Sequence, residues 1–388
     1  MAPPAVLTYL DHAATTPVRR EVLDAMAPFY GERFANPSGS HRAARDARRA
    51  VDEARECVAD AVGCDPGEVV FTSGGTESDN AAILGAAGRG RIVCSGSEHH
   101  AVLEAVHRAG GDIVSVAPDG AIDLDCLAAL LDDGVGAVSA MAVNNEVGTI
   151  TDLAAVSRLV RAKSPLALVH TDAVQAACWL DLRGIWQHVD AMSLSAHKFG
   201  GPKGIGALIV RAGHALSPLL VGGGQERDRR SGTLNVPGIV GLAVALHLAD
   251  SEREGEVSRI AALRDRLVDG IVVGVAAEFP GADPGIVETV PRTRKVAGSA
   301  HLCVDGAESE ALLYLLDEAG VCASAASACA SGAMEPSHVL ASMGVSPRLA
   351  RGAVRLTLGR TTTCDDVDRA TAAMVAAVCR VRRAGVVR

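Results

Sequence analysis

One lysine lies where a charged side chain is costly, directly after the apolar run 190–196 and just before the glycine-rich segment 200–206. Ser195 and His197 bring hydrogen-bond donors close to Lys198, and the glycines leave space for a bulky ligand near the backbone. A lysine at a strand end usually just reaches water. In this setting, however, an amine with a lowered pKa is suited to attack an aldehyde, as covalent binding of pyridoxal phosphate requires.

A phosphate-bearing cofactor also needs a site for its anion. Gly75 and Thr76, in "SGGTESDN", stand at the start of a predicted helix, whose free N–H groups and dipole favour a phosphate. A simple capped helix start is the alternative, because Thr76 and Asp79 have the spacing of a capping box.

Four further polar residues match the needs of the cofactor ring and the substrate. Asp172 ends an apolar strand and would pair with a pyridinium N–H, while Gln175 could reach the phenolate oxygen. His99, in "SEHHAV", could stack on the ring, with the adjacent His100 as its competitor. Asn145, in "VNNEVG", is placed to touch cofactor or substrate. No H-E-x-x-H pair or other ligand spacing supports a metal site.

Two residues near the carboxyl terminus stand out for different reasons. Cys329 lies in a stretch, 323–333, that has no bulky side chain and therefore predicts an exposed, mobile loop. A thiol on such a loop is suited to attack at one place and delivery at another, whereas Cys322 resembles a structural residue at a strand entry. Arg355 interrupts a strand pattern, which suits either a carboxylate-binding guanidinium or a surface edge residue.

Short apolar strands alternate with helices and would bring these groups together. Strands are predicted at 69–75, 91–95, 112–118, 136–145, 166–173, 190–196 and 206–210, and helices at 42–63, 77–87, 100–110, 123–133 and 153–162. Repeated βα units with nearly continuous apolar strands predict a mostly parallel α/β sheet that helices cover on both faces. Because polar clusters follow five strands, they should meet in one crevice.

A second αβ region follows a long helix predicted over 237–273. It contains strands at 298–304 and 353–359 and helices at 309–320 and 365–383. We expect a large cofactor-binding domain over 15–255 and a small domain formed by 1–14 and 256–388, which carries the Cys329 loop.

Composition narrows the class of protein. A net charge of −9 argues against a broad nucleic-acid or anionic-membrane surface. The ten cysteines are scattered without a C-x-x-C pair, and the start of the chain lacks the pattern of a signal peptide. No apolar run approaches the roughly 18 residues of a membrane span. These features predict a cytoplasmic protein that acts directly on neither nucleic acid nor membrane.

Ten segments together resemble a known family. They are, in order, "YLDHAATTP", "ANPSGSH", "FTSGGTESDN", "EHHAV", "NNEVGT", "HTDAVQ", "SLSAHKFGGPKGIGAL", "GGGQERDRRSGT", "SACASGAMEPSHVL" and "VRLTLGR". The chain resembles the pyridoxal phosphate-dependent cysteine desulfurases of the NifS/IscS type, within the class-V aminotransferases. The resemblance implies a homodimer of the aspartate aminotransferase fold (fold-type I) that converts L-cysteine to L-alanine and loads the sulfur onto its own cysteine as a persulfide.

The resemblance also implies roles for single residues. Lys198 would be the Schiff-base lysine, Cys329 the sulfur acceptor, and His99 the residue that stacks on the ring and relays protons. The remaining cofactor and substrate contacts would come from Gly75, Thr76, Ser195 and His197 at the phosphate, Thr233 at the partner subunit's phosphate, Asp172 at the pyridinium, Gln175 at the phenolate oxygen, and Asn145 and Arg355 at the substrate carboxylate. Ala326 replaces a glycine that is usual in the family's loop.

Several alternatives remain at this point. A selenocysteine lyase or an aminotransferase would use the same cofactor and fold, and a docking subunit would chiefly deliver sulfur under a partner's control. The small-residue loop with Cys329 argues against an aminotransferase, and Lys198, Asp172 and Cys329 together argue against a purely binding role. The sulfur could go to an iron–sulfur cluster scaffold, to tRNA or DNA thiolation, or to a biosynthetic protein.

Overall fold

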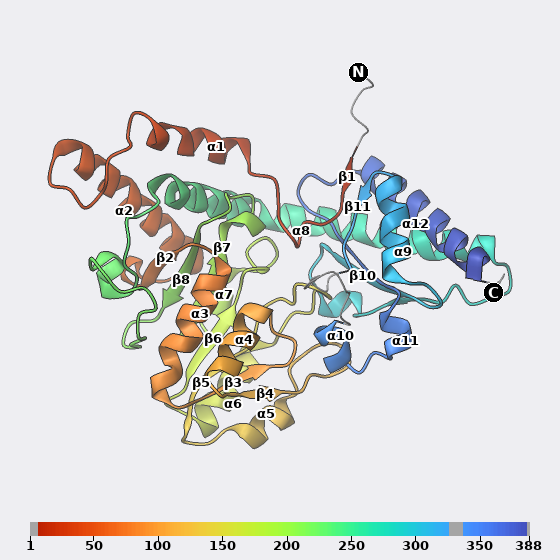
Figure 1. Cartoon of the computed structure of the whole chain (residues 1–388), viewed down its shortest axis with the longest axis horizontal. Coiled ribbons are helices and arrows are strands. Elements are labelled where there is room, and N and C mark those ends of the chain that lie inside the picture. The colour runs from red at the N-terminus through yellow and green to blue at the C-terminus, as the bar shows by residue number, and fades with distance from the viewer. Residues whose placement is uncertain (1–6, 326–336, 386–388) are drawn as a thin grey trace.

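A seven-stranded sheet forms the centre of the larger part of the molecule. The computed structural model describes residues 7–325 and 337–385 (Figure 1). In spatial order the strands are β2 (Val69–Thr72), β8 (Gly206–Val210), β7 (Ala191–Ser195), β6 (Leu168–Asp172), β5 (Val135–Ser139), β3 (Arg91–Ser95) and β4 (Asp112–Val114). Every described pair is parallel except the two that involve β8. The predicted α/β architecture with a mostly parallel sheet is therefore confirmed.

The antiparallel direction of β8 has a simple cause. Two consecutive strands can pair in parallel only if the connection between them crosses over the sheet, which takes about a dozen residues or more and usually contains a helix. Only residues 196–205 separate β7 from β8, and they hold nothing longer than the single turn η4 (Ala196–Lys198). The chain therefore reverses directly after Lys198, which leaves that lysine at the carboxyl end of β7.

Helices cover both faces of the sheet. Val69 and Phe71 point to one apolar cluster and Val70 to another, because alternate residues of a strand face opposite ways. The face with Val70 packs against α3 (Gly75–Ala86) and α4 (His100–Arg108). The opposite face packs against α1 (Arg20–Met26), α2 (Arg42–Val62), α6 (Leu153–Lys163), α7 (Leu182–Trp186) and the first half of α8 (Val236–Glu278). The helix α5 (Leu124–Leu130) lies at the β4 edge.

A smaller unit holds a second core. Its antiparallel sheet has the order β12 (Ala353–Thr357), β10 (Ser299–Val304) and β9 (Ile286–Glu288), beside the parallel pair of β1 (Thr8–Tyr9) and β11 (Val321–Cys322). The helices of this unit are α9 (Ser309–Glu318), α10 (His338–Ser342), α11 (Pro347–Ala350) and α12 (Cys364–Gly385).

One long helix connects the two cores. The helix α8 (Val236–Glu278) has 43 residues and extends past both ends of the predicted 237–273 (Figure 1). Its Leu242 and Leu246 belong to the core of the large sheet, whereas Leu263 and Leu267 belong to the core of the small unit. Within the described ranges, no helix is both long and apolar enough to cross a membrane.

Candidate active site

A pocket of about 850 Å³ opens at the carboxyl ends of the parallel strands. Its walls include ten of the residues singled out in the sequence, namely Gly75, Thr76, His99, Asn145, Asp172, Gln175, Ser195, His197, Lys198 and Arg355. They come from the last residues of β6 and β7, from the segments that follow β2, β3, β5, β6 and β7, and from β12 of the small unit. The polar groups at the five strand ends thus meet in one crevice, as their positions predicted.

Lys198 is held against the backbone of the segment 13–14. Its Nζ donates to the carbonyl oxygens of Ala13 and Ala14 at 2.6 and 2.9 Å. Burial and, to a smaller extent, the Arg355 cation lower the pKa of Lys198 to about 8, while Asp172 and Asp11 oppose them. The amine is therefore far easier to deprotonate near neutral pH than an exposed lysine.

Asp172 is the last residue of β6 and lines the same pocket. Its Oδ1 accepts a hydrogen bond of 2.8 Å from the backbone N–H of Val174. Burial raises the pKa of Asp172 to about 6, against the effects of that N–H and of the Lys198 cation. A buried carboxylate of this kind favours a cationic N–H as its partner.

The start of α3 contributes backbone N–H groups rather than a capped turn. The N-cap residue is Gly74, at φ +154°, and no side chain caps the helix. A Cβ on Gly75 would lie 2.7 Å from Val174 Cγ2, so the close approach of α3 to that loop requires a glycine. The capping box considered for Thr76 and Asp79 is wrong, because the helix begins at Gly75 and Asp79 is buried, 1% exposed.

The segment 13–16 ties together several predicted residues and was missed in the sequence. Gln175 Nε2 donates to the Ala13 oxygen at 2.8 Å, and His197 Nδ1 lies 3.1 Å from Thr15 Oγ1. His99 is the N-cap residue of α4, where its Nδ1 accepts from the Ala101 N–H at 3.0 Å. The motif "DHAATTP" marks this segment in the sequence, but residue types do not show which backbone carbonyls will accept hydrogen bonds in the pocket.

Arg355 reaches the pocket from β12 and is 5% exposed, so the surface-edge alternative is wrong. Its Nη2 pairs with Asp11 Oδ1 at 2.7 Å, and its Nη1 donates to the Asn145 oxygen at 2.8 Å. Its Nε is buried and has no hydrogen-bond partner among the described residues. Asp11, which positions this guanidinium, was not predicted from the sequence.

The structure does not place two further predicted residues in this pocket, one of them because it lies outside the described ranges. Thr233 is exposed and does not line it. Cys329 lies outside the residues that the structure describes, as does Ala326. Cys322 lies in β11 beside β1, in agreement with the structural role predicted for it.

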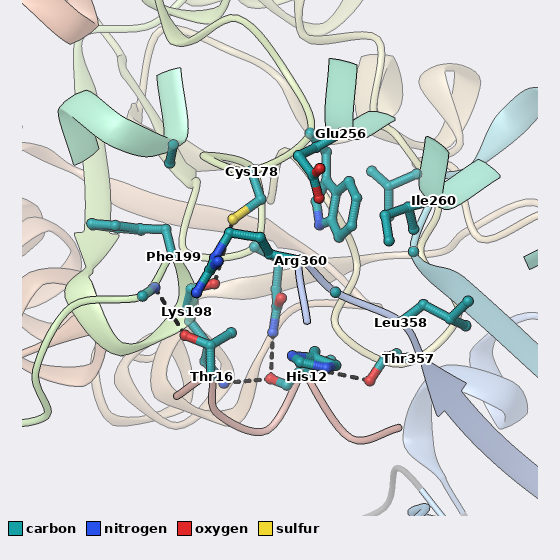
Figure 2. Close-up of a pocket in the computed structure, with 18 of the residues that line it drawn as sticks. His12, Thr16, Cys178, Lys198, Phe199, Glu256, Ile260, Thr357, Leu358 and Arg360 are labelled. Atoms are coloured by element: carbon teal, nitrogen blue, oxygen red, sulfur yellow. Dashed lines mark hydrogen bonds between the residues drawn. The ribbon is translucent and has the colours of Figure 1, made fainter. Parts of the chain in front are cut away.

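A second, smaller cavity is also lined by Lys198. It shares Ala13, Asn145, Gln175 and Lys198 with the first pocket. Figure 2 shows Cys178, Phe199, Glu256 and Arg360 around it, with Ile260 and Leu358 from the small unit. Burial raises the pKa of the Cys178 thiol to about 11, so this sulfur is a poor nucleophile at neutral pH.

The residues of the first pocket fit pyridoxal phosphate. Lys198 offers an amine of lowered pKa, and α3 offers an uncapped amino terminus for a phosphate. One buried polar atom of a pocket residue, Arg355 Nε, has no partner among the described residues, as expected where a ligand completes the contacts. Within the described part of the chain, no group of histidine, cysteine or acidic side chains is arranged to hold a metal ion.

Comparisons with known proteins point the same way. A relative from Mycobacterium tuberculosis, described as an IscS-like cysteine desulfurase, is 42% identical over 394 residues, which cover 97% of this chain and 98% of the relative. A solved NifS-like protein matches with a TM-score of 0.87 at 36% identity, over 96% of this chain and 99% of that chain. The structure described as SspA in complex with cysteine matches with a TM-score of 0.74 at 32% identity, over 90% and 98%.

These likenesses extend over both units of the fold. The family model described as aminotransferase class-V matches residues 8–370, which include the first strand, the whole large sheet and most of the small unit. Together with the lysine–aspartate pocket, this match confirms the predicted resemblance: the chain belongs to the aminotransferase class-V family of pyridoxal phosphate-dependent enzymes.

Proposed function

We propose that the chain is a cysteine desulfurase that converts L-cysteine to L-alanine and takes the sulfur onto Cys329 as a persulfide. The observation that carries the proposal is the joint placement of Lys198, Asp172 and Arg355 around one pocket. An amine, a buried carboxylate and a buried guanidinium with a free N–H match a cofactor aldehyde, a ring nitrogen and an amino-acid carboxylate. The names of its relatives support this reaction.

Substrate binding depends on the small unit. Arg355 would bind the carboxylate of cysteine, because Asp11 and the Asn145 carbonyl fix two of its nitrogens and leave Nε unpaired. Asn145 lies beside it on the pocket wall and would add a further contact. The carboxylate fixed in this way orients the α-carbon of cysteine toward Lys198.

Cofactor contacts come from the large sheet. Lys198 would attach the cofactor, Asp172 would hold its ring nitrogen protonated, and Gln175 would contact its phenolate oxygen. The amino terminus of α3 with Gly75 and Thr76, together with Ser195 and His197, would hold the phosphate, while His99 would cover the ring. All of these side chains or backbone groups line the one pocket. When bound, pyridoxal phosphate withdraws electrons from the substrate's α-carbon and so weakens the adjacent bonds.

Lys198 and Cys329 would then move the proton and the sulfur. Lys198, as a neutral amine, would remove the α-proton, and the lowered pKa makes that form accessible near neutral pH. The Cys329 thiolate would attack the substrate sulfur, so that an S–S bond forms while the bond between that sulfur and the β-carbon breaks. The electron pair of the broken bond stays with the β-carbon, which takes up a proton, and Lys198 would return a proton to the α-carbon, so that the product is alanine.

Replacement of Cys329 tests this step. We expect Cys329→Ala to retain the visible absorption of bound cofactor, because the variant keeps every residue proposed to hold the cofactor. The variant should form no enzyme persulfide and release no sulfide with a reductant, since the nucleophile is absent. Mass spectrometry of the cysteine-treated protein and a sulfide assay measure both outcomes, with Cys322→Ala as the matched control.

The same variant separates the desulfurase from a selenocysteine lyase. Suppose that Cys329→Ala loses turnover of cysteine but keeps turnover of selenocysteine. This result agrees with the proposal only if the wild-type enzyme prefers cysteine to selenocysteine as its substrate. Full cysteine desulfurase activity in the variant would refute the role of Cys329.

We further propose that the enzyme is a homodimer and that a protein accepts its sulfur in a reducing cytoplasm. A persulfide enzyme needs an acceptor, and an iron–sulfur cluster scaffold or a thiolation protein has the required chemistry. The nine described cysteines are all unpaired, as a reducing compartment favours. Incubation of the sulfur-labelled enzyme with candidate acceptors, followed by detection of the label, tests this part.

A further inference from the structure

Two buried acidic side chains have no assigned role: Asp79, which lines the cofactor pocket, and Glu98. Asp79 and Glu98 are 1% and 0% exposed, and Asp172 beside them is 4% exposed. Asp79 comes from α3, Glu98 from the loop after β3, and Asp172 from the end of β6. Three carboxyl groups from three elements thus share one almost completely buried region under the sheet's carboxyl end.

A chain of neutral polar groups connects these acids. Ser139 Oγ donates to Glu98 Oε1 at 3.2 Å and lies 2.9 Å from His170 Nδ1. His170 Nε2 lies 3.0 Å from Ser193 Oγ and 3.7 Å from Asp79 Oδ1. The register of the strands explains this: Ser139 pairs with His170, and Asp172 pairs with Ser193, so all four side chains share the face that α3 covers.

The charges in this region do not balance if all three acids are ionised. The cation that faces them is Lys198, which lowers the pKa of Asp172. His170 stays neutral, because burial lowers its pKa to about 3, and Lys198 together with burial keeps the pKa of His99 low, at about 4. His338 of α10 lies 2.9 Å from the backbone oxygen of Glu98 and stacks near His100.

The hydrogen bonds identify which acids keep their protons. Asp172 has the Val174 N–H and the Lys198 cation, whereas Asp79 Oδ1 and Glu98 Oε2 are buried with no partner in the described structure. An ionised oxygen without a donor is costly in a protein interior. Burial, followed by the charge of Asp172, raises the pKa of Glu98 to about 8, against hydrogen bonds from Ser139 and from the backbone of Met141 and His99. The same two causes raise the pKa of Asp79 well above its ordinary value, against a hydrogen bond from Ser193.

We propose that Asp79 and Glu98 are a protonated, neutral pair that leaves Asp172 as the ionised carboxyl group presented to the cofactor's ring nitrogen. The inference deepens the proposed function, since it concerns how the chain tunes the cofactor site. Both are positioning residues: they act through Asp172. If either were ionised at neutral pH, its charge would favour protonation of Asp172 and change the electrostatic field at the ring.

Infrared spectroscopy of the wild-type holoenzyme tests the proposal without any substitution. We expect a carboxylic acid C=O band at neutral pH that shifts in heavy water, with part of its intensity lost in Asp79→Asn and part in Glu98→Gln. A wild-type spectrum with no such band would overturn the proposal. The infrared bands do not depend on sulfur transfer, so this test stays valid even if Cys329 is not the sulfur acceptor.

The pH dependence of unfolding provides the second test for Glu98. A carboxyl group whose folded pKa is raised keeps its proton in the native state while the unfolded chain releases it, so stability falls as pH rises from about 4.5 to about 8. Glu98→Gln removes this loss. We expect the unfolding constant of the wild-type holoenzyme, relative to the variant's, to rise at least about tenfold between about pH 6 and pH 8. If the ratio of the two unfolding constants does not change with pH, Glu98 is merely a structural residue and the proposal is wrong.

The cofactor's visible spectrum provides the test for Asp79. Asn is neutral and similar in shape, so Asp79→Asn should leave the spectrum of the bound cofactor at neutral pH unchanged if Asp79 is already neutral. Asp172→Asn, the control, removes a charge and should shift that spectrum. A shift of similar size in Asp79→Asn would show that Asp79 is ionised and refute the proposal.

Discussion

At the scale of single residues, the chemistry depends on the environment of Lys198. Its amine lines the pocket and donates hydrogen bonds to the Ala13 and Ala14 carbonyls. Its pKa is lowered to about 8. An ordinary lysine has a pKa of about 10.4 and is almost fully protonated at neutral pH. The fold thus prepares the amine for reaction, which residue type alone does not show.

This environment predicts how the cofactor-free enzyme takes up pyridoxal phosphate. Only the neutral amine reacts, so the attachment rate should rise about tenfold per pH unit below about 8 and level off above about 9. Stopped-flow absorbance measures the rate. Lys203→Ala, at an exposed neighbouring lysine, should give the same curve. A rate that still climbs steeply above pH 9 would indicate an ordinary lysine and contradict the lowered pKa.

The sequence predicted most pocket residues for one physical reason and missed others for another. Asp172 and His99 were found because polar side chains after apolar strands are conspicuous in a sequence. Asp79 entered the sequence analysis only through the alternative of a helix cap, since an acid in the first turns of a helix is common on surfaces. Only the packing of α3 on the sheet shows that Asp79 is buried.

At the scale of elements, the close contact of α3 with the loop after β6 determines the phosphate site. Gly75 lies so close to Val174 that a Cβ would come within 2.7 Å of its side chain. Any side chain at this position pushes the helix start away from the backbone groups that would face the phosphate.

Gly75→Ala should therefore weaken cofactor binding. Overpacking of this kind costs about 1–3 kcal/mol, so we expect the dissociation constant to rise about tenfold or more. Gly88→Ala is the matched control, because Gly88 follows the same helix and a Cβ there meets no atom within 4 Å. Spectroscopic titration of the cofactor-free proteins gives both constants. Equal affinities in the two variants would show that α3 does not hold the phosphate.

Elements were predicted well where periodicity is strong and less well where packing decides. The strands and the helices around the large sheet follow the predicted order, but β4 ends at Val114 instead of residue 118. The antiparallel β8 was not foreseen, because strand direction depends on how the short connection after Lys198 turns in space.

At the scale of the whole molecule, two cores support the predicted division of the chain. Leu10 packs with Ile260 and Leu267, whereas Val22 and Leu246 belong to the core of the large sheet. We therefore propose that residues 15–255 form the large domain and that residues 1–14 and 256–388 together form the small domain. The amino-terminal segment leaves the small unit through Asp11 and reaches the pocket at Ala13.

The homodimer proposal can be tested with mixed subunits. Thr233 is exposed and lies outside its own chain's pocket, as expected if it contacts the partner subunit's phosphate. Thr233→Asp should weaken cofactor binding through charge repulsion, and Lys198→Ala should abolish attachment.

A dimer that combines one subunit of each kind retains one intact pocket, so we expect it to regain about half of the wild-type activity. Co-expression with two different tags isolates this species, and sedimentation velocity confirms its mass. Inactive mixed dimers, or a monomer in solution, would refute the contribution of Thr233 across subunits.

By itself the sequence determined the fold class, the family and the strand ends that bear polar groups. This is possible because hydrophobic periodicity and strand-end chemistry are local, and the carboxyl ends of parallel strands must meet at one edge. Tertiary structure alone decided the pairing of Arg355 with Asp11, the carbonyls that hold Lys198, and the burial of Asp79 and Glu98. Those features depend on the packing of segments far apart in the chain, on which local residue patterns carry no information.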